Sequence, residues 1–133
     1  MLFRSDGCVQ GLLELLHIPY THSGVLASSV AMNKEVAKTL MAAAGVPTPQ
    51  GRVVHRLEAA QGHVLPPPYV LKPVSEGSSF GVFIVGFGAN APPKDLSDPG
   101  WSHGDMMLAE KFISGRELTC AVMGDRQIGR AHV

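Results

Sequence analysis

The order of the segments predicts an α+β fold, with helices first and a mainly antiparallel sheet after them. Apolar residues recur at helical spacing as far as Ala44, and short apolar runs between turn residues take over from Gly51. Short connections join these runs, which favours antiparallel pairing over the alternating helices and strands of a parallel sheet. The 133 residues, 45% of them hydrophobic, are enough for one domain with a hydrophobic core.

Two helices are expected in the first thirty or so residues. Residues 9–16 carry apolar side chains at helical spacing, and this helix should end near His17, because Pro19 disfavours helical geometry at Ile18. A second, short helical segment should begin at Ser23 and Gly24 and run through Val30 or Met32.

The third helix has the clearest boundaries. Asn33 suits its N-terminal cap, Gly45 suits its C-terminal end, and Pro47 lies just beyond. Its apolar side consists of Val36, Ala37, Leu40, Met41 and Ala44.

The remainder should consist mainly of strands. Strands are expected at residues 52–55, 69–71, 80–85, 106–111 and 117–123, with a helical turn at 57–61 and a further strand after a tight reversal at Gly124 and Asp125. Residues 66–68 are prolines that form a stiff entry to the second strand, and residues 114–116 form a turn. Residues 86–104 are rich in glycine and proline, so a loop without a regular helix is expected there.

Composition excludes several classes of function. The formal net charge is zero, so neither a nucleic-acid partner nor an anionic membrane surface is expected. The sequence has no run of roughly 18 apolar residues, so no membrane-spanning helix is expected. Residues 1–8 lack the apolar region of a signal peptide. The histidines and cysteines lack the spacing of metal ligands, so no metal site is expected within the chain. Cys8 and Cys120 are expected to be reduced thiols of a cytoplasmic protein.

A candidate phosphate-binding segment follows the second strand. Lys72 ends that strand, and small or hydroxyl-bearing residues follow it in the loop made of Glu76, Gly77, Ser78 and Ser79. Small residues let the backbone approach an anion, and successive N–H groups with a nearby ammonium form a cradle for phosphate. The segment lacks the P-loop and dinucleotide patterns, and an ordinary hairpin with a surface lysine is the alternative interpretation.

Further candidates lie on either side of this loop. Glu110 and Lys111 end an apolar strand before Phe112 and Ile113, an arrangement that can bind an adenine through backbone groups and apolar side chains. The carboxylate of Glu117 could bond ribose hydroxyls. Lys34 lies in the first turn of the third helix, where the helix dipole disfavours a cation and a bound anion would relieve it. Solvent-exposed charges are the alternative interpretation at each of these positions.

Taken in order, these segments resemble the D-alanine–D-alanine ligase family of the ATP-grasp superfamily. The resemblance rests on DGCVQGLLELLHIPYTHSGVLASSVAMNKEVAK (6–38), GVPTP (45–49), YVLKPVSEGSSFGV (69–82) and MLAEKFISGRELTCAVMG (107–124). Each motif is weak alone, but their combination in this order is specific to the family. The resemblance implies N-terminal helices followed by the smaller ATP-grasp subdomain.

The resemblance also implies roles for the candidate residues. Lys34 and Lys72 resemble the lysines that contact the phosphates of ATP, and residues 76–79 resemble the loop that covers them. Residues 110–113 resemble the adenine-contacting segment, and Glu117 resembles the ribose-binding glutamate. Family members use ATP and magnesium to phosphorylate one D-alanine, whose acylphosphate the amine of a second attacks to give D-alanyl-D-alanine for peptidoglycan. They are expected to be homodimers.

The chain departs from the family pattern in ways that bear on activity. Asn33 stands where an aspartate is usual, Phe80 stands where a smaller aliphatic residue is usual, and residues 126–133 fit poorly. We expect residues 1–48 to be linker helices and residues 49–133 to be the small subdomain, truncated at its C-terminus. The catalytic residues and magnesium ligands of the family have no counterpart here, so the fragment is expected to be inactive alone. A different carboxylate–amine ligase, such as a D-alanine–D-lactate type, or a nucleotide-binding module without catalysis remain alternatives.

Overall fold

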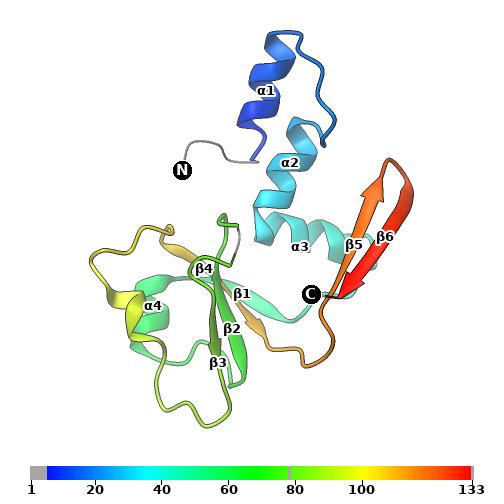
Figure 1. The fold of residues 1–133 in the computed structure, drawn as a ribbon. Helices are drawn as coiled ribbons and strands as arrows, with labels where there is room; N and C mark the ends of the chain where they lie inside the picture. The colour runs from blue at the N-terminus through cyan, green and yellow to red at the C-terminus, as the bar shows by residue number, and fades with distance from the viewer. Residues whose placement is uncertain (1–5, 78, 133) are drawn as a thin grey trace.

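The computed structural model describes residues 6–77 and 79–132. The helices are α1 (Cys8–Leu15), α2 (Val25–Met32), α3 (Lys34–Ala43) and α4 (Arg56–Gln61), and one 3-10 turn is η1 (Lys94–Ser97). The strands are β1 (Gly51–His55), β2 (Tyr69–Pro73), β3 (Phe83–Val85), β4 (Met106–Lys111), β5 (Leu118–Met123) and β6 (Arg126–His132). The predicted α+β order is confirmed, since α1 to α3 precede the strand-rich part along the chain, and α1 and α2 lie above the main sheet in Figure 1.

The capping of α3 follows the sequence prediction. The Asn33 side-chain oxygen accepts hydrogen bonds from the backbone N–H groups of Glu35 and Val36, at 3.1 and 3.2 Å. Gly45 has φ +76°, the left-handed geometry that ends a helix without steric cost. These two caps fix where α3 begins and ends, and therefore which of its side chains face the sheet.

The strands β1 to β4 form one antiparallel sheet in the order β1-β4-β2-β3. Strand β4 is central: its Ala109 is opposite Arg52 of β1 and Leu71 of β2. Tyr69 and Leu71 of β2 and Met107 and Ala109 of β4 all have 0% exposure, so these alternate residues face the core. The intervening residues of both strands must therefore face the opposite side of the sheet.

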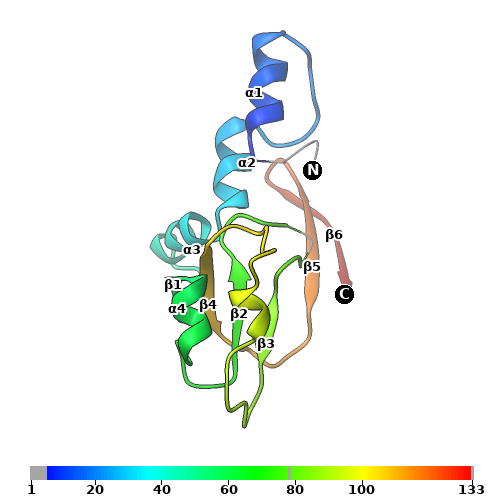
Figure 2. The same ribbon diagram turned by 90° about the vertical axis from the view of Figure 1, so that its left-hand side faces the viewer.

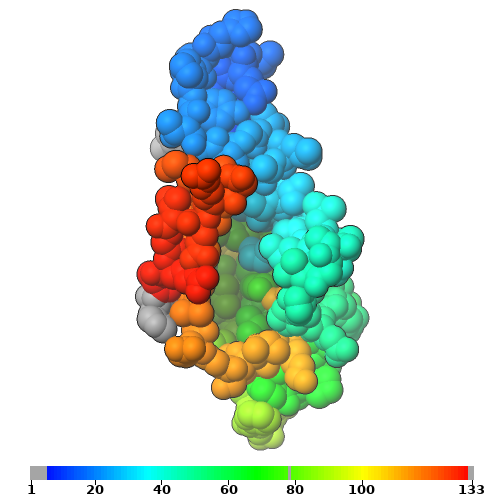
Figure 3. Space-filling view, turned by 90° about the vertical axis from the view of Figure 1, so that its right-hand side faces the viewer, coloured from blue at the N-terminus to red at the C-terminus, as the bar shows by residue number. Residues whose placement is uncertain are grey.

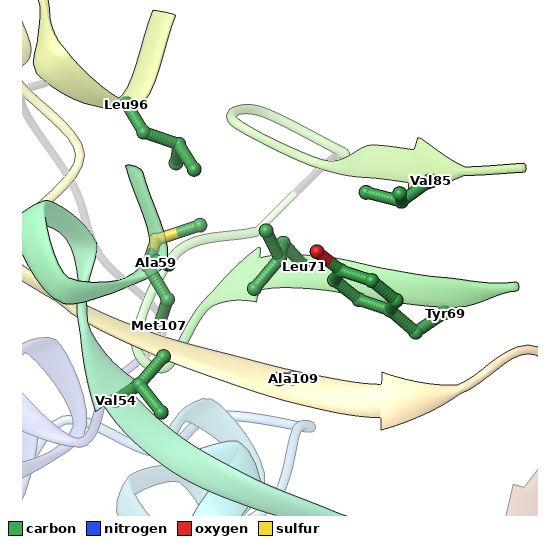
Figure 4. Close-up of a cluster of buried hydrophobic side chains, with 8 residues drawn as sticks. All are labelled: Val54, Ala59, Tyr69, Leu71, Val85, Leu96, Met107 and Ala109. Carbon is green, nitrogen blue, oxygen red and sulfur yellow. The ribbon is translucent and has the colours of Figure 1, made fainter. Parts of the chain in front are cut away.

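The core lies between this sheet and the layer formed by α4 and η1. Its buried apolar residues are Val54, Ala59, Tyr69, Leu71, Val85, Leu96, Met107 and Ala109 (Figure 4). Leu96 comes from η1, the one helical turn within the segment expected to be a loop. In Figure 2 α4 and η1 lie in front of the sheet, whereas α3 and the β5–β6 hairpin lie on its other side in Figure 1. The face with Lys72 and Glu110 is thus not covered by the main core.

One strand prediction needs correction, and another is confirmed with a partner that the sequence did not specify. The strand expected from residue 80 begins only at Phe83, because Ser79 and Gly81 adopt positive φ values of 60° and 66° that break extended geometry. The strand expected at 117–123 is confirmed as β5, and it lies outside the main sheet. It pairs with β6 in a separate two-stranded sheet, and the chain reverses between them at Gly124, which has φ +60°.

No helix in residues 6–77 or 79–132 has the length and apolar character needed to cross a bilayer.

Candidate functional site

Lys72 and Glu110 meet on the face of the sheet that α4 and η1 do not cover. Val70 is opposite Glu110, and Lys72 is opposite Leu108, so Lys72 and Glu110 are diagonal neighbours on adjacent strands. The Lys72 ammonium forms an ion pair with Oε2 of Glu110, whose side chain is only 7% exposed. Both residues were expected from the sequence to contact opposite ends of a nucleotide, and the structure joins them directly in an ion pair.

Lys38 completes this cluster and was missed by the sequence analysis. Its ammonium donates a hydrogen bond to the Pro49 carbonyl oxygen at 2.6 Å and another to Oε1 of Glu110. Lys38 lies four residues after Lys34 on α3, so both lysines share one side of the helix. The four-residue spacing of Lys34 and Lys38 is the sequence signal that could have identified Lys38.

Lys34 ties the start of α3 to the segment after β2. Its ammonium donates hydrogen bonds to the carbonyl oxygens of Pro73, at 2.9 Å, and Glu76, while its backbone N–H donates to Val74 O at 3.0 Å. Carbonyl oxygens thus supply the negative partial charge that the sequence analysis expected from a bound anion. Lys34 is therefore half-buried at the base of residues 76–79, the candidate phosphate loop.

The candidate phosphate loop turns sharply between β2 and β3. An added Cβ at Gly77 would meet no atom within 4 Å, so the backbone there is open to a ligand. Ser79 has φ +60°, and Ser78 lies outside the described residues. Phe80, which departs from the family pattern, stacks on His103 with ring centroids 6.2 Å apart. This contact draws Phe80 toward the 101–103 segment.

The electrostatics of the cluster favour its charged forms. Burial acts to raise the pKa of Glu110, but hydrogen bonds from Lys38 and Lys72 outweigh it and hold the pKa below its ordinary value. Burial lowers the pKa of the Lys34 ammonium, and the like charge of Lys72 lowers it further, against the opposing effects of Glu76 and Glu110. Glu110 is therefore a carboxylate at neutral pH.

The candidate adenine-binding residues lie at the end of β4. The N–H of Lys111 donates to Gln50 O at 2.8 Å, and the N–H of Phe112 donates to Pro68 O at 3.1 Å. Lys111 borders a mostly apolar cavity of about 310 Å³, whose other lining residues are Gln50, Leu65, Pro66, Pro67 and Pro68. Ile113 is 62% exposed, and Glu117 is exposed just before β5. In the described structure, Glu117 forms no ion pair with the three lysines.

The surface is hollowed on the side of the lysines. Figure 3 shows this hollow between α3 and the β5–β6 hairpin, with the region of β2 at its floor. A different cavity of about 450 Å³ adjoins the loop, and its lining includes the carboxylates of Glu35, Glu76 and Asp105. Because those charges repel an anion, the hollow beside the lysines is the better place for phosphate.

The described residues contain no group of three or more His, Cys, Asp or Glu side chains able to hold a metal ion.

The fold defines a class of protein. N-terminal helices followed by a small antiparallel sheet match the fold of ATP-grasp ligases. A sequence profile described as "D-ala D-ala ligase C-terminus" matches residues 40–133. The chain therefore belongs to the D-alanine–D-alanine ligase family.

Curated relatives carry the same family name. The D-alanine–D-alanine ligase of Methylobacterium radiotolerans is 63% identical over 124 residues, which are 93% of this chain and 40% of the relative. That of Parvibaculum lavamentivorans is 62% identical with the same coverage. The chain thus spans about 40% of the length of these relatives.

Solved structures agree with the fold. The D-alanine–D-alanine ligase of Bacillus anthracis is 32% identical with a TM-score of 0.73, over 96% of this chain and 42% of that chain. A structure of the Bacillus anthracis ligase complexed with ATP is 29% identical with a TM-score of 0.66, over 96% and 41%. The VanG D-Ala:D-Ser ligase of Enterococcus faecalis is 29% identical with a TM-score of 0.71, over 93% and 37%.

Proposed function

We propose that this chain is the part of an ATP-dependent D-alanine–D-alanine ligase that covers one side of the nucleotide. Residues 1–48 are its linker helices, and residues 49–133 are its small subdomain. The observation that carries the proposal is the Lys72–Glu110 ion pair on the open face of the sheet, flanked by two lysines of α3. Relatives named D-alanine–D-alanine ligase and a structural neighbour complexed with ATP support it.

In this proposal, the cations bind the phosphates and the end of β4 binds the base. Lys72 and Lys34 face the phosphates, and the loop of Glu76, Gly77, Ser78 and Ser79 covers them with backbone N–H groups. Glu110 and Lys111, with Phe112 and Ile113, contact the adenine, and Glu117 bonds the ribose. Each lysine must exchange a present partner for phosphate, since Lys72 contacts Glu110 and Lys34 contacts two carbonyl oxygens.

The chemistry explains why cations are required. A carboxylate is a poor acyl donor, and transfer of the γ-phosphoryl group of ATP to one D-alanine gives an acylphosphate with a good leaving group. The amine of a second D-alanine then attacks the acyl carbon and releases phosphate. Lys34 and Lys72 would stabilise the negative charge on the transferring phosphoryl group. Magnesium, when bound, would neutralise phosphate charge, but no cluster of ligands among the described residues fits it.

A second candidate is a ligase that joins D-alanine to another acceptor. The similarity to the VanG D-Ala:D-Ser ligase favours keeping it, because the phosphate-binding part serves any acceptor. Full-length enzyme supplied with ATP and D-alanine separates the two: product with D-alanine alone supports the first candidate, and a requirement for D-serine or D-lactate supports the second.

We further propose a cytoplasmic homodimer, to be tested by fractionation and analytical ultracentrifugation of the full-length enzyme.

The nucleotide role is tested by titrating ATP against wild type and Lys72→Ala. Losing a cation that contacts phosphate should weaken affinity about tenfold or more, equivalent to ~1.4 kcal/mol or more. Lys94→Ala, which removes an exposed lysine of η1, is the matched control and should bind as wild type does. Unchanged affinity in Lys72→Ala would remove the phosphate role.

A further inference from the structure

Lys38 occupies a junction of three segments. It extends from α3, donates to the carbonyl oxygen of Pro49 just before β1, and donates to Glu110 on β4. Its side chain is 20% exposed, less than the 28% of Lys72. Because Pro49 and Glu110 both hold its ammonium, Lys38 is more firmly fixed than Lys72, for which Glu110 is the ion-pair partner among the described residues.

Glu110 divides its two oxygens between two cations. Oε1 accepts from Lys38, and Oε2 pairs with Lys72. A carboxylate that is 7% exposed needs at least one cation or strong donor to remain ionised, since removal from water disfavours its charge. Because two cations contact this carboxylate, either cation can leave while the other still compensates the negative charge of Glu110.

The same cluster keeps a positive excess for an anion. The ammonium groups of Lys34, Lys38 and Lys72 stand against the carboxylates of Glu110 and Glu76, which leaves three positive and two negative charges. Lys38 offsets the charge of Glu110, so the charge of Lys72 remains available to a ligand in the hollow beside it.

We propose that Lys38 is a positioning residue that holds Glu110 as a carboxylate, so that Lys72 can leave it for a phosphate of the bound nucleotide. The inference rests on the nucleotide-binding function proposed above. Without Lys38, the transfer of Lys72 to phosphate leaves the buried Glu110 carboxylate without a cation. Phosphate binding must then overcome the free-energy cost of this uncompensated charge. Adenosine has no phosphate and leaves the Lys72–Glu110 pair in place, so its affinity does not depend on Lys38 in this way.

The test compares ATP and adenosine affinities of the whole chain, measured by displacement of a fluorescent ATP analogue. Lys38→Met should weaken ATP binding about tenfold at pH 8 but change adenosine binding by less than about twofold. Lys38→Arg, which keeps a cation beside Glu110, should restore most of the ATP affinity. Lys94→Met, an exposed site, is the control for loss of one positive charge and should match wild type.

The pH profile separates positioning from a merely structural role. Protonation of Glu110 removes the stranded charge, so the ATP deficit of Lys38→Met should shrink as the pH falls from 8 toward about 5.5. In a Glu110→Gln background, Lys38→Met should cost no further ATP affinity. A pH-independent deficit, an equal loss for adenosine, or an Arg variant as weak as the Met variant would each overturn the inference.

The outcomes also separate this inference from the proposal on which it depends. If wild type binds no ATP, the nucleotide function fails and the role of Lys38 falls with it. If wild type binds ATP and Lys72→Ala weakens it while Lys38→Met does not, the nucleotide function stands and only the role of Lys38 is refuted. Should Lys38→Met fail to fold, judged by circular dichroism, Lys38→Arg and the Glu110→Gln background decide the matter.

Discussion

At the scale of single residues, Glu110 determines how the charges of the site are arranged. It is buried, yet it keeps its charge because Lys38 and Lys72 each hold one of its oxygens. Its neighbours come from α3 and β2, so the ion pairs also join these two elements to β4. The residue therefore contributes both to stability and to the polarity of the open sheet face.

The dependence of stability on acid follows from this pairing. The pKa of Glu110 in the folded chain lies below its ordinary value of 4.5, so its contribution is present above the unfolded-state pKa and is lost as pH falls through the folded-state pKa. Glu110→Gln should be less stable than wild type by about 1–3 kcal/mol at pH 7, because two charged hydrogen bonds are lost. The difference should shrink on acidification below about pH 5.

Urea unfolding at a series of pH values measures this difference. Glu117→Gln removes an exposed carboxylate outside the cluster and is the matched control, which should follow the wild-type curve. A gap between Glu110→Gln and wild type that is as wide at pH 3 as at pH 7 would contradict the ion-pair account.

Sequence reasoning selected Lys34, Lys72 and Glu110 but could not derive their partners. Residue type and position at a strand end or helix start pointed to each one separately. Pairing of β2 with β4 sets which residues become diagonal neighbours, and that register is a tertiary property. Lys38 was missed because its spacing from Lys34 indicates only a shared side of the helix, and its contact with Glu110 forms when α3 docks on the sheet.

At the scale of elements, turns and caps position the site. The tight turn before β3 requires a left-handed residue at Gly81, with φ +66°. A Cβ there would lie 2.9 Å from Pro73 Cγ and 3.1 Å from Trp101 Cη2, so the turn packs closely on its surroundings. This packing fixes where the candidate phosphate loop leaves β2 and returns to β3.

Gly81→Ala should therefore destabilise the fold by at least about 1–2 kcal/mol, the cost of left-handed geometry for a residue with a Cβ. Thermal unfolding followed by the fluorescence of Trp101, the single tryptophan, measures the change. Gly86→Ala is the control, because its added Cβ meets nothing within 4 Å, and it should change stability by less than ~0.5 kcal/mol. Equal stability of the two variants would show that the turn tolerates a side chain.

The cap of α3 allows a second test at this scale. Asn33→Ala removes the acceptor for two N–H groups and should cost about 1 kcal/mol in free energy of unfolding. Asn33→Asp, the usual family residue, keeps the acceptor and gains from the helix dipole. Glu35, Glu76 and Asp105 line the same cavity and repel the new charge, so we expect it to match wild type within about 0.5 kcal/mol. An Asp variant as unstable as the Ala variant would contradict the capping account.

The predicted elements held best where local chemistry decides them. Asn33 and Gly45 marked α3 correctly, and apolar runs marked β2 and β4. The start of β3 was placed too early because the positive φ of Ser79, a residue that seldom adopts it, is imposed by the turn. The separation of β5 and β6 from the main sheet could not be read from the sequence, since a strand pattern does not identify its partner.

At the scale of the whole molecule, the sheet presents two unlike faces. One is sealed by α4 and η1 over an apolar core, and the other carries the charged cluster beneath the hollow between α3 and the β5–β6 hairpin (Figure 3). All described side chains of β5 are exposed, and within residues 6–77 and 79–132 the β5–β6 hairpin forms a separate two-stranded sheet. This arrangement leaves the charged face accessible to a nucleotide.

The most direct test of the account is to map ATP on the isotopically labelled chain by amide chemical shifts. The account predicts that the largest changes fall at Lys34, Lys72, residues 76–79 and residues 110–113, with little change in α1 and α4. Adenosine should perturb residues 110–113 but not residues 76–79. Shifts concentrated in α1 or α4, or no saturable shifts at all, would contradict the proposal that this face of the sheet binds the nucleotide.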